Sequence, residues 1–149
     1  MTKRISMFLV ATLTFGLVSV IGTLGARAQE PELVATMNGA NEVPGPGDPE
    51  GYGRVWLYGE GDQACYTITW HDIAAPHAAH IHRGVRSEAG PVVATLFNTE
   101  QSGHRAEYCT SDYDHDLAAD VIAHPSNYYV NLHNEDYPNG AIRGQLREL

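Results

Sequence analysis

Basic residues are scarce in this sequence, and lysine is almost absent. The 149 residues include 9 lysines and arginines against 18 aspartates and glutamates, which gives a formal net charge of −9 with histidine neutral. Residues 29–149 keep six basic residues, all arginines, and all 18 acidic ones, a balance of −12. A surface of this charge repels nucleic acid and anionic lipid. We therefore expect no nucleic-acid partner and, beyond residue 28, no association with a membrane.

Long apolar runs are also missing, except for one at the N-terminus. Residues 5–24 carry no charge, follow the basic pair Lys3-Arg4, and lead to the small-x-small sequence Ala26-Arg27-Ala28. This order is typical of a secretory signal peptide, so we expect residues 1–28 to be cleaved and the protein to be secreted or periplasmic. An uncleaved anchor is the alternative, because about 20 apolar residues can span a bilayer.

Only two cysteines are present, Cys65 and Cys109. Neither follows the N-terminal apolar run directly, so a lipoprotein anchor is not expected. Both lie in the part of the chain that we expect to be exported, where an oxidising compartment favours pairing. The sequence predicts one disulfide, with two separate thiols as the alternative because bridging distance cannot be judged from sequence.

Helical periodicity is limited to one segment. Residues 112–124 begin with aspartates that can cap a helix, carry apolar residues on one face and precede Pro125, so they are predicted to be helical. The aspartates lack the spacing of an EF-hand calcium loop. Short strands separated by Gly/Pro turns account for most of the rest, at residues 33–37, 54–59, 65–71, 79–84, 91–97, 128–133 and 141–146. We expect 91–97 to be buried on both faces and 98–105 to be a polar loop. Residues 29–149 are therefore predicted to form one all-β domain, an antiparallel Greek-key β-sandwich or flattened barrel with one short helix.

A His-x-His pair is the clearest chemical signal in the chain. On an extended strand His80 and His82 point to one face, about 7 Å apart, while Ile81 points to the other. Two imidazoles can ligate a transition metal, but two ligands alone hold a metal poorly. The alternative is a pair of ordinary surface histidines.

The last predicted hairpin, formed by residues 128–133 and 141–146, supplies a third candidate histidine. If Val130 and Leu132 face the core, His133 faces away from it, and Arg143 shares that outward face. We expect His133 to lie opposite Arg143 or Gln145, which requires an odd-length loop or a bulge near residues 137–140. The alternatives are a solvated His133 and an Arg143 that pairs with Glu135 or Asp136.

Four segments together resemble the chordin-type (CHRD) domain family. They are Leu33 to Pro44 with Asn-Gly-Ala-Asn-Glu-Val-Pro, Ala79 to Gly84 with Ala-His-Ile-His-Arg-Gly, Gly90 to Leu96, and Tyr128 to Leu146. The resemblance runs across nearly all of residues 29–149 and implies a secreted protein, but it implies no single activity.

A more distant likeness is to the copper-zinc and copper-only superoxide dismutases, which are also Greek-key sandwiches. It implies copper ligands at His80, His82 and His133, and a catalytic Arg143 that attracts the small anionic substrate superoxide. Their bridging histidine and zinc ligands have no clear match, so the fourth copper position stays open among His71, His104 and His115.

These patterns predict a secreted copper-binding protein that dismutates superoxide by Cu(II)/Cu(I) cycling. Three imidazoles favour copper, or zinc as the alternative, over magnesium or calcium. The competing hypothesis is a non-catalytic binding or copper-storage module. A zinc hydrolase is less favoured, because no carboxylate stands in a general-base motif.

Overall fold

The computed structural model describes residues 32–149. The expected signal peptide, residues 1–28, lies outside this range. Within it, no helix is both long enough and apolar enough to cross a membrane. The elements are β1 (Leu33–Asn38), η1 (Gly39–Asn41), β2 (Tyr52–Glu60), β3 (Gln63–His71), β4 (Ala78–Arg83), β5 (Val92–Phe97), β6 (Arg105–Thr110), α1 (His115–Ala123), η2 (Pro125–Asn127), β7 (Tyr128–His133), β8 (Ile142–Gln145) and β9 (Arg147–Glu148).

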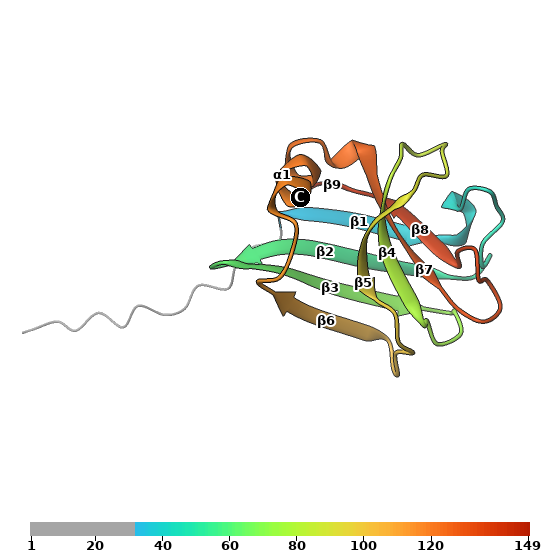
Figure 1. The fold of residues 1–149 in the computed structure, drawn as a ribbon. Helices are drawn as coiled ribbons and strands as arrows, with labels where there is room; N and C mark the ends of the chain where they lie inside the picture. Colours follow the sequence, from blue (N-terminus) through green and yellow to red (C-terminus); the bar gives the residue numbers. More distant parts are fainter. Residues whose placement is uncertain (1–31) are drawn as a thin grey trace, which may run out of the picture.

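The strands form one antiparallel sheet in the order β5-β4-β7-β8-β1-β2-β3-β6, with the short β9 paired to β1. Figure 1 shows the sheet curling, so that β4 and β5 pass across the layer of β1, β2 and β3. The prediction of an antiparallel all-β fold with one short helix is confirmed, in the form of a curled half-barrel. Curling lets one sheet bury its own inner face, because its two ends approach each other.

The inner face carries the core. On β3 the alternating residues Tyr66, Ile68 and Trp70 are all buried, as expected for a strand with one face on the core. Met37 of β1 and Leu132 of β7 are fully buried in the same cluster. Each such side chain contributes about 1.5 to 3 kcal/mol when removed from water. The core therefore joins strands from both ends of the half-barrel.

Strand β6 was not predicted from the sequence. It pairs with β3 at one end of the sheet, and its register places Cys65 opposite Cys109. The two cysteines form a disulfide, which confirms the predicted bridge and is typical of exported proteins. Strand β6 has no clear alternation because most of its residues are exposed. Its place is decided by pairing with β3 and by the disulfide.

Strand β5 corrects another expectation. Residues 91–97 were predicted to be buried on both faces, but β5 lies at the edge of the sheet and only Phe97 is buried. An apolar run indicates burial only when neighbours cover both faces, and β5 has a single paired neighbour, β4. Val92 is half exposed as a result.

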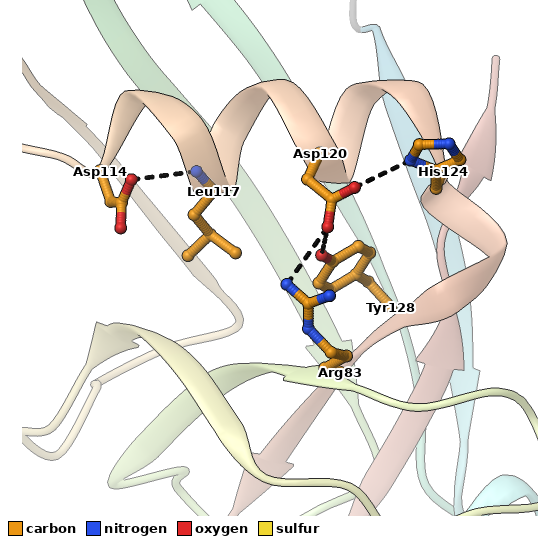
Figure 2. Close-up of polar contacts among 6 residues, drawn as sticks. All are labelled: Arg83, Asp114, Leu117, Asp120, His124 and Tyr128. Atoms are coloured by element: carbon orange, nitrogen blue, oxygen red, sulfur yellow. Dashed lines mark hydrogen bonds and ion pairs between the residues drawn. The ribbon is translucent and has the colours of Figure 1, made fainter.

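Helix α1 begins later than predicted, at His115, because Asp114 is its N-cap and accepts a hydrogen bond from the Leu117 amide at 3.0 Å. At its other end Asp120 attaches the helix to the sheet (Figure 2). The Asp120 carboxylate accepts hydrogen bonds from the Tyr128 hydroxyl and from His124 Nδ1 at 2.8 Å, and lies 3.2 Å from Arg83 Nη2. These contacts join α1 to β4 and β7.

We expect Asp120→Asn to lower the Tm near pH 7, with a difference from wild type that disappears once the pH falls below the lowered pKa of folded Asp120. The hydrogen bonds from Tyr128 and His124 lower the pKa of Asp120, so their stabilisation is present above the unfolded pKa and is lost as pH falls through the folded one. Thermal melts across pH measure this. The control Asp116→Asn removes a charge from the same helix and should change Tm less. Equal Tm values for Asp120→Asn and wild type at pH 7 would contradict the anchoring role.

Candidate metal centre

The three predicted histidines meet on the outer face of the sheet. His80 and His82 lie on β4 and His133 lies on β7, which is hydrogen-bonded directly to β4. Opposite His133 on β4 is Ala78, and opposite His80 is Asn131, so the three imidazoles lie on neighbouring strands of one face. One ring nitrogen from each histidine lies within 4.8 Å of the other two. The pairing of β4 with β7 therefore assembles the cluster.

The expected partner of His133 was wrong. Arg143 lies opposite Asn131, and Gln145 lies opposite Tyr129. The prediction of an odd-length connection was correct. Nine residues, 133–141, connect Leu132 of β7 to its partner Ile142 of β8. The sequence analysis compared the hairpin strands only with each other, and so missed that His133 joins the site through β4.

Two of the histidines are held by backbone carbonyls through Nδ1. His82 Nδ1–H donates to the Gly90 carbonyl at 2.8 Å, and His133 Nδ1–H donates to the Pro138 carbonyl at 3.0 Å. Each bond leaves Nε2 unprotonated in the neutral ring. The Nε2 atom of His82 is buried and has no hydrogen-bond partner in residues 32–149. A bound metal ion would satisfy this atom, so the donor set fits a transition metal.

The third nitrogen of the cluster comes from His80. Its Nδ1 lies 3.1 Å from His133 Nε2, and the two ring centroids are 4.9 Å apart at 61°. His133 Nε2 also lies 3.1 Å from the Asn131 side-chain amide. In the neutral ring that donates through Nδ1 to Pro138, Nε2 carries no proton, so His80 Nδ1–H donates the bond between the two histidines. Metal binding at both atoms would replace the hydrogen bond and place the His80 proton on its Nε2. The donor set is then His80 Nδ1, His82 Nε2 and His133 Nε2.

All three rings are kept neutral by their surroundings. Burial is the main cause of a His133 pKa lowered to about 4; the hydrogen bond to the Pro138 carbonyl opposes it, and the neighbouring His80 and His82 lower the pKa as well. Burial is also the main cause of the lowered pKa of His80 and of His82. Neutral imidazole is the form that ligates a metal. The site therefore offers three metal-binding nitrogens at neutral pH without first losing protons to solvent.

Arg143 does not reach the surface. It is 1% exposed, and its Nη2 donates to the carbonyls of Val85 and Glu88 at 2.9 and 2.8 Å. Its Cζ lies 3.3 Å from the centre of the Tyr129 ring, and the other side of that ring stacks on His82 at 4.7 Å, since β4 and β8 flank β7. The guanidinium thus fastens the loop after β4 and lies one aromatic ring away from His82.

The same geometry can now be compared with known proteins. Residues 33–146, from the first residue of β1 to just past β8, match the CHRD domain. The chain belongs to the CHRD domain family. No curated protein and no solved structure matches the chain. The match covers all three histidines and Arg143, so the whole candidate centre lies inside the CHRD domain.

In this CHRD domain the three histidines proposed as a fourth ligand do not join the cluster. His71 stacks on Tyr52 and on His104, with ring centroids 4.9 and 5.6 Å away, and His115 packs on Tyr113. His77 immediately precedes β4 and lies outside the cluster, but its charge lowers the pKa of both His80 and His133.

Glu42 was missed as part of the CHRD core. It is 7% exposed, its Oε1 has no hydrogen-bond partner in the described chain, and burial raises its pKa to about 7 despite the nearby charge of Arg143. Gly140 has φ +141, and a Cβ there would lie 2.5 Å from the Glu42 carboxylate. A glycine in the β7–β8 loop therefore makes room for a buried acid.

Proposed function

We propose that this CHRD domain is an exported copper-binding protein whose centre, formed by His80, His82 and His133, dismutates superoxide. The observation that carries the proposal is the buried, unpartnered Nε2 of His82 beside two other imidazole nitrogens, all within 4.8 Å. Buried polar atoms in native proteins nearly always have a hydrogen-bond partner, a bound water or a bound ion. Export, either secretion or delivery to the periplasm after cleavage of residues 1–28, is supported by the disulfide.

Three neutral imidazoles are suited to copper or zinc and poorly suited to magnesium or calcium. When bound, copper would supply one-electron chemistry by alternating between Cu(II) and Cu(I). The chain's own residues do the rest: the carbonyls of Gly90 and Pro138 orient His82 and His133 and hold their protons on Nδ1. Supporting bonds of this kind raise ligand basicity and fix ring orientation. The distant likeness to superoxide dismutases in the His-x-His strand agrees with this arrangement.

Arg143 enters the proposal as a positioning residue. Its guanidinium is buried behind Tyr129, so it acts on an anion through its positive potential and through the loop that orients His82. The burial of Arg143 also favours a second candidate, a copper-storage or binding module without turnover. A fully covered arginine cannot touch a substrate in this conformation.

Copper loading of the full-length protein tests the proposal. We expect about one copper per chain by elemental analysis and nitrogen hyperfine structure in the EPR spectrum. In His82→Ala and His133→Ala, copper affinity should fall by more than the roughly 10- to 100-fold typical of losing a supporting residue. The matched control is His115→Ala, which removes an exposed histidine that packs on Tyr113 only.

A superoxide assay on the same samples separates the candidates. Rapid consumption by the copper protein, lost in His133→Ala and kept in His115→Ala, supports dismutation. Copper binding without consumption supports storage, and stoichiometric zinc in place of copper refutes the redox proposal. Failure of wild type to bind either metal would overturn both candidates.

A further inference from the structure

A second candidate site lies on the inner face of the curled sheet, between α1 and strands β3, β5 and β6. It is a cavity of about 520 Å³, within the range of small-molecule sites. Its walls are mainly apolar and aromatic, and include Tyr66, Leu96, Tyr108, Leu117, Val121 and Ile122. In Figure 1 this is the region where α1 and β5 face the layer of β2, β3 and β6. The curl leaves this end of the core unfilled.

The cavity is separate from the metal centre. Ile81 lines it, whereas His80 and His82, its neighbours on β4, belong to the cluster on the opposite face. The sheet itself therefore stands between the two sites. The inference below does not depend on the proposed copper chemistry.

The chain leaves apolar surface exposed at the cavity. Tyr108 is 58% exposed and Ile122 is 49% exposed, although both line the space. On the sequence prediction Ile122 would face the core with Leu117, but the helix leaves it at the rim. The interior needs no further polar partner at Tyr66, whose hydroxyl already donates to the Leu96 carbonyl at 2.9 Å. The apolar part of a ligand would therefore cover the exposed side chains and leave the Tyr66 hydroxyl with its hydrogen bond.

The charge of the lining is one-sided. Glu32, Asp112 and Asp114 line the cavity, and the described lining residues include no arginine, lysine or histidine. Asp114 also caps α1 through one carboxylate oxygen, which leaves its charge in place. Three carboxylates beside an apolar space attract a cation and repel an anion. Charge complementarity thus adds a head group to the apolar body.

We propose that this cavity binds a small amphiphile that has an apolar tail and one cationic head group. The tail lies among Leu117, Val121 and the wall formed by β5 and β3, and the head group lies at the acidic rim. The cavity suits an alkyl or aryl amine or quaternary ammonium compound. The disulfide between β3 and β6 keeps this wall closed, since Cys65 is among the lining residues.

Three probes with the same tail test the proposal by calorimetric titration of the full-length protein: decyltrimethylammonium and decanoate, each below its critical micelle concentration, and decanol below its solubility limit. We expect the cationic probe to bind best and decanoate worst. Replacing both Glu32 and Asp112 with the matching amides should reduce the advantage of the cation over decanol by about two- to fivefold, as for exposed charges. Amide chemical shifts in α1, β5 and β6 should move with binding.

Adjacent helix positions give a matched pair of variants. Ala118 lines the cavity, and the exposed Ala119 does not. Ala118→Phe should weaken the binding of decyltrimethylammonium by about tenfold or more, because excluding two methylene groups of the tail from the cavity already lowers the affinity by that factor. Ala119→Phe should bind like wild type, and thermal melts of both variants check folding.

Several outcomes would overturn the proposal. These are no binding of any probe, equal binding of decanoate and decyltrimethylammonium, or equal binding by Ala118→Phe and Ala119→Phe. None of these outcomes bears on copper binding, so the two proposals fail independently.

Discussion

Replacing Arg143 with methionine is expected to lower the free energy of unfolding by about 2 to 6 kcal/mol, because each of two carbonyls left without a donor costs about 1 to 3 kcal/mol. The guanidinium is 1% exposed and donates to two loop carbonyls, Val85 and Glu88. Methionine fills part of the volume but donates no hydrogen bond. The carbonyls lose their partners, and Glu42 loses the nearby positive charge that lowers its pKa. Urea denaturation at pH 7 measures the change.

The same substitution should weaken copper binding by about 10- to 100-fold without touching a ligand, because the loop that Arg143 fastens also carries Gly90, the acceptor for His82 Nδ1. Arg86→Met is the control, since Arg86 belongs to the same loop, is exposed, and makes no side-chain hydrogen bond within the described chain. If the urea-denaturation midpoint of Arg143→Met equals that of Arg86→Met, Arg143 does not hold the loop.

Glu42→Gln is expected to change how stability depends on pH. Burial raises the pKa of Glu42 from 4.5 to about 7, so the folded protein holds a proton that the unfolded chain has already released. The stability from this group is fully present below pH 4.5 and is lost as pH rises to and through about 7. The loss is about 3 kcal/mol at pH 8, because each pKa unit is worth about 1.4 kcal/mol.

Glutamine keeps the shape but stays neutral, so Glu42→Gln should match wild type near pH 4.5 and exceed it at pH 8. Chemical denaturation at several pH values measures both, and Glu50→Gln, an exposed change in the same loop, serves as the control. If Glu42→Gln is instead less stable than wild type at pH 8, the ionised carboxylate stabilises the fold by pairing with Arg143.

Much of the fold could be predicted because the signals are local. Alternation in β3 correctly placed Tyr66, Ile68 and Trp70 in the core, and a capping aspartate with a following proline correctly indicated α1. Strand β6 and the edge position of β5 could not be predicted, because both depend on which strand lies beside them. An exposed strand such as β6 carries no hydrophobic period, and an apolar edge strand such as β5 resembles a buried one.

The candidate site divides in the same way. His80 and His82 were predicted from alternation alone to share a face, since residues two apart on a strand do so wherever the strand lies. The outward face of His133 was predicted in the same way, but its contact with His80 depends on the pairing of β7 with β4. The roles of Gly90, Pro138 and Glu42 were not predicted, because each comes from a loop whose path the sequence does not reveal. Arg143 was identified but expected near an open position, whereas the loop after β4 covers it.

By itself, the sequence determined that this is an antiparallel β protein with a His-x-His strand, two cysteines and a strongly acidic balance of charge. Each of these follows from composition or from a period of two along one strand. Only the tertiary structure decided that His133 meets His80 across β4 and β7, that Arg143 is buried, and that the curl leaves a cavity beside α1. The physical reason is that strand pairing and sheet curvature are set by contacts between residues far apart in the chain.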